Sequence, residues 1–165
     1  MTVTLEEIRA AQMRIAGKVA RTALQPSDAL SRRCGVPVYM KMEHRQPTGA
    51  FKLRGATNAV AMLGKDQRQR GVVAASTGNH GRALVYAAGL EGIDATICMS
   101  QLVPHNKRDA IAQLGAQICI DGDSQDDAQV KAEGLVAQHG MTMVQPFDDA
   151  GVIAGQGTIG LELIE

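Results

Sequence analysis

Lys52 lies in the stretch PTGAFKLRG, residues 47–55, among neighbours of little charge or bulk. Phe51 precedes it, and Gly49 and Ala50 are small, so its amine could rest against an apolar surface. Removal from water disfavours the ammonium form, and a neutral amine can attack an aldehyde to form a Schiff base. A surface lysine at the start of a helix would fit the same residues. This stretch alone therefore leaves both interpretations open.

A second candidate site is STGNHG, residues 76–81, which directly follows the short apolar run Val72–Ala75. A turn between a strand end and a helix start exposes backbone N–H groups, which can bind a carboxylate or a phosphate. The residues that could form this anion-binding turn are Ser76, Thr77, Gly78 and Asn79. An ordinary helix cap formed by Ser or Asn would explain the same sequence.

The elements that must position the lysine precede and follow it directly. Thr4 and Glu7 form a capping-box pattern before an amphipathic helix, and alternating apolar residues predict a strand that leads to the lysine. Up to residue 64, the expected elements are helices over 4–17, 26–33 and 52–63 and a strand over 36–43. The polar run Lys65–Arg70 is expected to be a loop or a short helical connection.

A regular alternation of strand and helix follows and includes the second candidate site. Expected strands over 72–75, 95–99, 117–120 and 141–144 alternate with helices over 79–90, 104–114 and 124–138. This pattern predicts an α/β fold of right-handed βαβ units with a small, mainly parallel sheet in three layers. We expect residues 1–70 to begin a large domain, residues 71–148 to form a small domain, and residues 149–165 to resume the large one. An expected helix over 152–165 has no stop signal, so we expect a fragment of a longer protein.

The composition excludes several classes of protein. Seventeen basic residues balance seventeen acidic ones, and the chain has two Phe, two Tyr and no Trp. A nucleic-acid binder that uses a basic surface or base-stacking aromatics is therefore not expected. No apolar run approaches the roughly 20 residues of a membrane span, and we expect a cytoplasmic protein. Its three cysteines are expected to be reduced and buried: Cys34, Cys98 and Cys119.

Together, the two candidate sites resemble one family. TGAFKLRGATNAV is similar to the (S/T)GSFKxRGA stretch, and ASTGNHGRALVYAA to the SxGNHxxA loop, of the fold type II pyridoxal-phosphate enzymes. The similarity continues through AGQGTIGLE at residues 154–162. The FKxRG motif favours the branch of threonine and serine dehydratases and serine racemase over cysteine synthases and tryptophan synthase β. STGNHGRAL, CMSQLVP and SQDDAQ most resemble the dehydratase subfamily of hydroxyectoine utilisation.

The resemblance implies a cofactor, pyridoxal 5′-phosphate, and a role for each matching residue. Lys52 would hold the cofactor covalently and later act as the base that removes the substrate α-proton, with Phe51 packed beside the cofactor. Asn79 would donate its amide to the pyridoxal 3′-oxygen. The residues implied to receive the substrate carboxylate are Ser76, Thr77, Gly78, Asn79 and His80. The implied reaction removes water from a β-hydroxy amino acid, such as L-threonine, L-serine or a hydroxyectoine-derived one, and gives a 2-oxo acid and ammonia.

The sequence departs from the family pattern at three points. Ala50 stands where the family often has Ser. Thr77 stands where dehydratases commonly have Ala and racemases have a catalytic Ser, which leaves a serine racemase-like isomerase as an alternative. The family's phosphate-binding glycines and pyridine-nitrogen partner would lie beyond Glu165, so these 165 residues alone are expected to be inactive. A non-catalytic small-ligand-binding module is the other alternative, and the intact protein is expected to be a homodimer or homotetramer.

Other patterns are weaker signals. Gly155, Gly157 and Gly160 spell GxGxxG, but no strand precedes them, so we expect them to permit close helix packing rather than dinucleotide binding. Arg82 is expected to be a surface arginine. Three histidines lack partners at metal-ligand spacing, so we expect no metal site: His44, His105 and His139.

Overall fold

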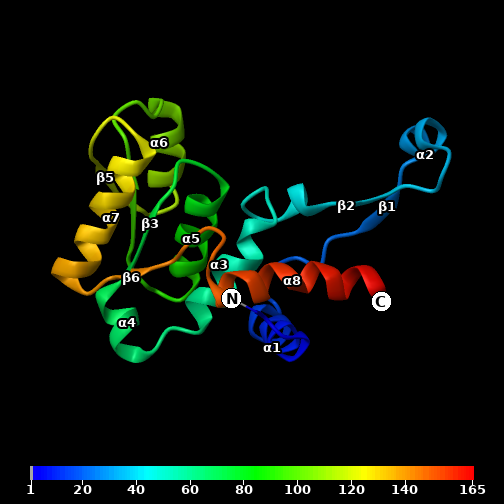
Figure 1. Cartoon of the computed structure of the whole chain (residues 1–165), viewed down its shortest axis with the longest axis horizontal. Coiled ribbons are helices and arrows are strands. Elements are labelled where there is room, and N and C mark those ends of the chain that lie inside the picture. Colours follow the sequence, from blue (N-terminus) through cyan, green and yellow to red (C-terminus); the bar gives the residue numbers. More distant parts are fainter. Residues whose placement is uncertain (1) are drawn as a thin grey trace.

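The computed structural model describes residues 2–165 as a mixed α/β chain (Figure 1). The helices are α1 (Leu5–Ile15), α2 (Asp28–Cys34), α3 (Lys52–Ala61), α4 (Lys65–Arg70), α5 (Asn79–Leu90), α6 (His105–Ala112), α7 (Gln125–His139) and α8 (Ala150–Ile164), with a 3₁₀ turn η1 (Glu43–Arg45). The strands are β1 (Leu24–Pro26), β2 (Tyr39–Lys41), β3 (Val72–Ala75), β4 (Ala95–Met99), β5 (Gln117–Ile120) and β6 (Thr142–Met143).

A four-stranded parallel sheet in the order β5-β4-β3-β6 confirms the predicted α/β class. Alternate residues of β3 face opposite layers. Val72 and Ala74 belong to the same apolar cluster as α5, whereas Val73 and Ala75 pack with α7. Because helices cover both faces, the whole strand is buried, and β3 therefore appears as a continuous apolar run in the sequence.

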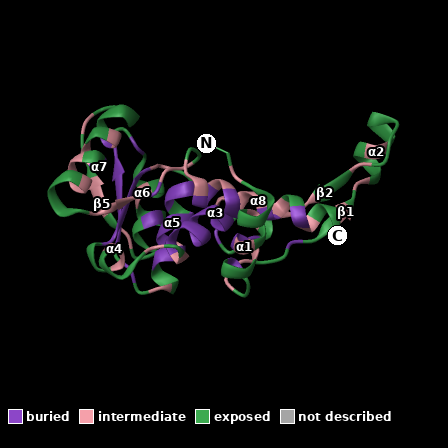
Figure 2. Ribbon diagram, turned by 60° about the horizontal axis from the view of Figure 1, so that its bottom comes forward, coloured by how far each residue is buried: buried purple, intermediate pink, exposed green. Residues whose placement is uncertain are grey.

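Helix α3 carries Lys52 and lies at the centre of the packing, against both α5 and α8 (Figure 2). A Cβ atom on Gly155 of α8 would lie 2.6 Å from the Arg54 carbonyl oxygen and 2.6 Å from Gly55 Cα. One on Gly157 would lie 2.8 Å from the Ile8 side chain of α1. These contacts confirm the predicted close helix packing at two glycines. The prediction is wrong for Gly160, where a Cβ would meet nothing within 4 Å.

Capping residues fix several helix ends, and the capping-box pattern predicted at Thr4 and Glu7 is confirmed. Thr4 and Glu7 form both bonds of a capping box at α1, and Ser124 and Asp127 do so at α7. Gly35 and Gly140 end their helices in the left-handed conformation, with φ of 72° and 65°. Such backbone angles favour glycine, which has no Cβ to clash.

The segment before the lysine differs from the prediction. The expected strand over 36–43 is paired only over Tyr39–Lys41, antiparallel to β1, which was not predicted from the sequence. Pro26 belongs to β1, and α2 begins after its Ser27 cap. In Figure 1, β1, β2 and α2 form an arm at one end of the molecule, away from the parallel sheet. Three-residue strands are too short to show a clear periodicity.

The expectation that all cysteines are buried is wrong for Cys34, which is exposed on α2, a helix with no buried residue. Cys98 is buried on β4, and Cys119 is its half-buried neighbour on β5. Burial, with the adjacent Cys119 adding to it, raises the pKa of the Cys98 thiol to about 12. This thiol is therefore protonated and inert at neutral pH.

Within residues 2–165, no helix is long and apolar enough to cross a membrane. The same residues contain no cluster of metal-ligating side chains. The predicted domain boundaries near residues 70 and 148 stay a prediction.

Candidate active site

Lys52 is the first residue of α3, and its side chain is half-buried. Its Nζ donates a hydrogen bond to the Pro146 carbonyl oxygen at 2.5 Å and lies 5.4 Å from the centre of the Phe51 ring. No described carboxylate forms an ion pair with this amine. The amine is thus held by a backbone carbonyl and an aromatic ring rather than by a carboxylate of residues 2–165.

The turn at residues 76–81 is organised by the hydroxyl of Ser76. This oxygen accepts hydrogen bonds from the N–H groups of Gly81 at 3.0 Å and Gly78 at 3.4 Å. Helix α5 begins at Asn79, and within the described chain the N–H groups of Asn79 and His80 find no acceptor. Free N–H groups at a helix start can bind an anion, so the predicted carboxylate site has the required donors.

The side chain of His80 points away from solvent and is only 4 % exposed. Its Nε2 lies 2.8 Å from the Val144 carbonyl oxygen. Because a carbonyl only accepts, Nε2 carries the proton, and the other nitrogen, Nδ1, is buried with no partner among residues 2–165. Burial lowers the pKa of His80, and the nearby Lys52 charge adds to this, against the opposing effect of the Val144 bond. The imidazole is therefore neutral at pH 7.

Lys52 and His80 converge on one short segment, residues 144–146, which links β6 to α8. The N–H of Val144 donates to the Val73 carbonyl oxygen at 3.0 Å, so the sheet holds the start of this segment. The structure thereby connects α3, which carries the lysine, with the start of α5, which carries the anion-binding turn.

The remaining predicted residues lie on a more open surface. Thr77 is half-buried, whereas Gly78 and Asn79 are exposed. These three residues line a pocket of about 370 Å³ that also contains Arg82 and Lys107 and does not include Lys52. Arg82 is exposed, as predicted, although it borders this pocket.

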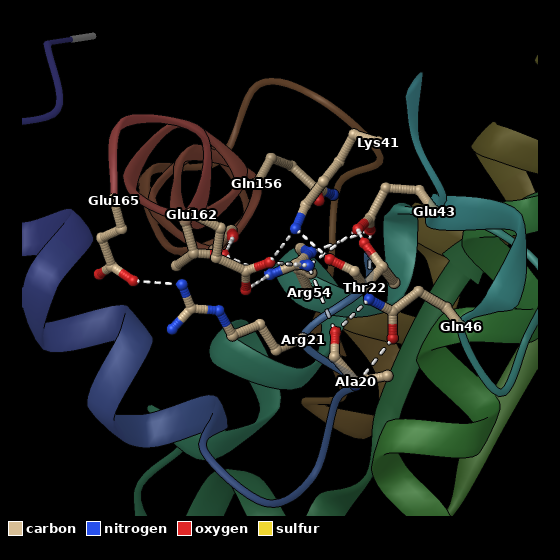
Figure 3. Close-up of polar contacts among 12 residues, drawn as sticks. Ala20, Arg21, Thr22, Lys41, Glu43, Gln46, Arg54, Gln156, Glu162 and Glu165 are labelled. Atoms are coloured by element: carbon tan, nitrogen blue, oxygen red, sulfur yellow. Dashed lines mark hydrogen bonds and ion pairs between the residues drawn. The ribbon is translucent and has the colours of Figure 1, made fainter. Parts of the chain in front are cut away.

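A buried ion-pair network centred on Arg54 of α3 was not predicted from the sequence (Figure 3). Arg54, two residues after Lys52, is fully buried and pairs with Glu43 at 2.8 Å and Glu162 at 2.6 Å. Glu162 also pairs with Lys41 at 2.5 Å. The network ties the first turn of α3 to η1, β2 and α8. An arginine between apolar positions of a buried helix was the available signal.

The carboxylates of this network remain ionised. Burial by itself raises the pKa of Glu43, but hydrogen bonds from Arg54, Thr22 and Gln46 outweigh it and lower the pKa below its ordinary value. The same balance holds for Glu162, with Arg54 and Lys41 as donors. Burial opposes the charge of Arg54 as well, yet its two carboxylate partners raise its pKa.

These features fit the cofactor that the sequence resemblance implied. A half-buried amine without a carboxylate partner can bind an aldehyde, and free N–H groups at the start of α5 can bind an anion. Phe51 and Asn79 are partly exposed and thus accessible to a ligand. The residues that would hold pyridoxal phosphate within this chain are Phe51, Lys52 and Asn79.

Comparison with known proteins agrees with this class of site. Residues 15–165 match the family described as "Pyridoxal-phosphate dependent enzyme", and the chain belongs to that family. It is 56 % identical over 163 residues to a putative threonine dehydratase of Sinorhizobium fredii, covering 99 % of this chain and 49 % of that protein. It is 47 % identical over 163 residues to the L-threonine ammonia-lyase of Thermotoga maritima, covering 99 % of this chain and 41 % of that protein.

Among solved structures, maize serine racemase has a TM-score of 0.95 and 34 % sequence identity, over 99 % of this chain and 50 % of that one. The predicted fold type and cofactor class are thereby confirmed. The chain spans about half the length of the relatives it matches. The predicted roles of the individual site residues stay predictions.

Proposed function

We propose that the intact protein is a pyridoxal-phosphate-dependent dehydratase, an ammonia-lyase that eliminates water from a β-hydroxy amino acid to give a 2-oxo acid and ammonia. The observation that supports it best is the convergence of Lys52 and His80 on residues 144–146, because it connects the reactive amine with the anion-binding turn. When bound, the cofactor supplies an electron sink for the negative charge left at the substrate Cα.

The side chains and backbone of this chain supply binding and proton transfer. The N–H groups of Asn79 and His80 bind the substrate carboxylate and orient the Cα–H bond. The Nζ of Lys52 takes the proton from Cα. Phe51, whose ring centre lies 5.4 Å from this amine, packs beside the cofactor. The buried pairs of Arg54 hold α3 in place during these steps.

L-Threonine and L-serine are the proposed substrates, since the most similar relatives described above are named threonine dehydratase and threonine ammonia-lyase. A hydroxyectoine-derived hydroxy amino acid is a more specific proposed substrate, and only the residues of the sequence motifs support it. Thr77 keeps a hydroxyl group in the anion-binding turn, so a serine racemase-like activity is the second candidate. A dimeric or tetrameric assembly and a cytoplasmic location stay predictions.

A substrate panel on the intact, cofactor-loaded protein separates these candidates. Formation of a 2-oxo acid and ammonia from L-threonine or L-serine supports the dehydratase. Formation of D-serine without 2-oxo acid supports the racemase instead. Amino-acid binding without turnover of any β-hydroxy amino acid in the panel would leave only a ligand-binding module and contradict the enzyme proposal.

A further inference from the structure

We propose that His80 is a positioning residue whose Nε2–H bond to the Val144 carbonyl fixes residues 144–146, so that the Pro146 carbonyl holds the Lys52 amine in place. This inference rests on the proposed function in one respect, namely the reaction for which Lys52 is positioned. Its structural basis is independent of any cofactor, because both hydrogen bonds are formed within the chain.

The two donors reach the same segment because their helices pack together. Lys52 opens α3 and His80 lies in the first turn of α5, and these helices are direct neighbours. Two further restraints act at the start of the segment: the Val144 side chain is buried in the apolar core, and its N–H donates to the Val73 carbonyl oxygen. Without the His80 bond, no hydrogen bond to the Val144 or Gln145 carbonyl would remain among residues 2–165, and Pro146 would be held less firmly. Gln145 precedes Pro146, and a residue before proline favours an extended backbone. This preference keeps the carbonyl groups of Val144 and Pro146 apart.

The unsatisfied ring nitrogen of His80 indicates that the other nitrogen is the one that matters. A buried acceptor without a partner costs stability, and an apolar side chain of similar size would avoid that cost. The histidine is therefore useful for its other nitrogen, the one that donates to Val144. Direct proton transfer is a poorer explanation, because Nε2–H is already bound to a carbonyl and burial keeps the ring neutral.

Two substitutions test whether the hydrogen bond to Val144 needs the donor at the position of Nε2 or only a polar side chain at residue 80. The amide nitrogen of Gln occupies nearly the position of histidine Nε2, whereas that of Asn corresponds to Nδ1. His80→Gln should keep the bond to Val144, and His80→Asn should lose it. The exposed His105 offers a matched control, His105→Asn.

The readout is the rate at which an amine-acylating reagent modifies Lys52 in the cofactor-free intact protein, followed by mass spectrometry of its peptide. His80→Asn removes a bond between neutral groups, but it frees residues 144–146 and so weakens the charge-assisted bond from Lys52 Nζ to the Pro146 carbonyl. A hydrogen bond to a charged group is worth a factor of about ten or more, so His80→Asn should react about tenfold faster than wild type. His80→Gln and His105→Asn should stay within about twofold of wild type. Thermal unfolding shows whether each variant is folded, and His80→Leu replaces His80→Asn if the latter is not.

Equal acylation rates in wild type and the donor-less variant would overturn the proposal, as would a tenfold faster rate in His80→Gln. In the loaded protein, His80→Asn should lower kcat about tenfold and change KM for the amino acid by less than about threefold. If the cofactor never attaches to Lys52, the proposed function fails while the acylation result still decides this inference. If the cofactor attaches and acylation is unchanged, only the positioning role is wrong.

Discussion

Replacing Arg54 by methionine tests whether the buried network holds the lysine helix in place. The side chain is fully buried and donates four hydrogen bonds to two carboxylates, those of Glu43 and Glu162. Methionine fills much of the same volume without charge. Glu162 would keep Lys41 as a partner, and Glu43 would keep only hydrogen bonds from neutral groups. The uncompensated charge is therefore mainly that of Glu43.

Removing one partner of a buried ion pair costs about 3–5 kcal/mol. Because Lys41 and Thr22 still serve the two carboxylates, we expect a loss near the lower limit, about 3 kcal/mol at pH 7. With a urea dependence of about 2 kcal/mol per molar, the unfolding midpoint followed by circular dichroism should fall by about 1.5 M. The control is Arg21→Met, whose exposed pair with Glu165 should contribute less than about 1 kcal/mol (Figure 3).

The pH dependence provides the decisive comparison. In wild type the pKa values of Glu43 and Glu162 are lowered in the folded state, below their ordinary value of 4.5. Their stabilisation is therefore present above pH 4.5 and is lost as the pH falls through the folded-state pKa values. In Arg54→Met the buried Glu43 gains from protonation, so the stability difference from wild type should shrink on going from pH 7 to pH 4. A difference of equal size at both pH values would refute the reasoning.

Two further predictions concern α8 and the anion-binding turn. Gly155→Ala should destabilise the protein by about 1–3 kcal/mol, since its Cβ would meet the backbone of α3, whereas Gly160→Ala on the same helix should stabilise it by about 0.5–1 kcal/mol; denaturant titration measures both, and equal effects would contradict the close packing. Thr77→Ala should leave 2-oxo acid release from L-serine within about threefold of wild type and abolish any inversion of serine. Loss of elimination in Thr77→Ala would show that this residue acts in the dehydratase reaction.

Much of the fold could be predicted because its signals are local. The capping boxes at Thr4 and Ser124 and the apolar run of β3 depend on neighbours within a few residues. The strands β1 and β2 were missed or misplaced because three residues carry too little periodicity and are set by their pairing. Cys34 was expected to be buried, but its helix α2 lies on an exposed arm.

The site was predictable as a set of residues but not as an arrangement. Lys52 and the turn at residues 76–81 stand out by residue type and by their resemblance to a family. Their connection runs through Pro146 and Val144, which are 94 and 64 residues distant from Lys52 and His80. Arg54 likewise pairs with a carboxylate 108 residues away. Backbone carbonyls and distant partners have no signature in a single sequence.

Trapping the bond between Lys52 and the cofactor tests directly whether this lysine holds pyridoxal phosphate. The intact protein is incubated with pyridoxal phosphate, treated with borohydride to make the linkage permanent, digested, and analysed by mass spectrometry. We predict that the cofactor mass is found on the peptide that contains Lys52 and that Lys52→Ala lacks both this mass and the visible absorbance. A protein that stays colourless, or a cofactor found on another lysine while Lys52 is unmodified, would contradict the account.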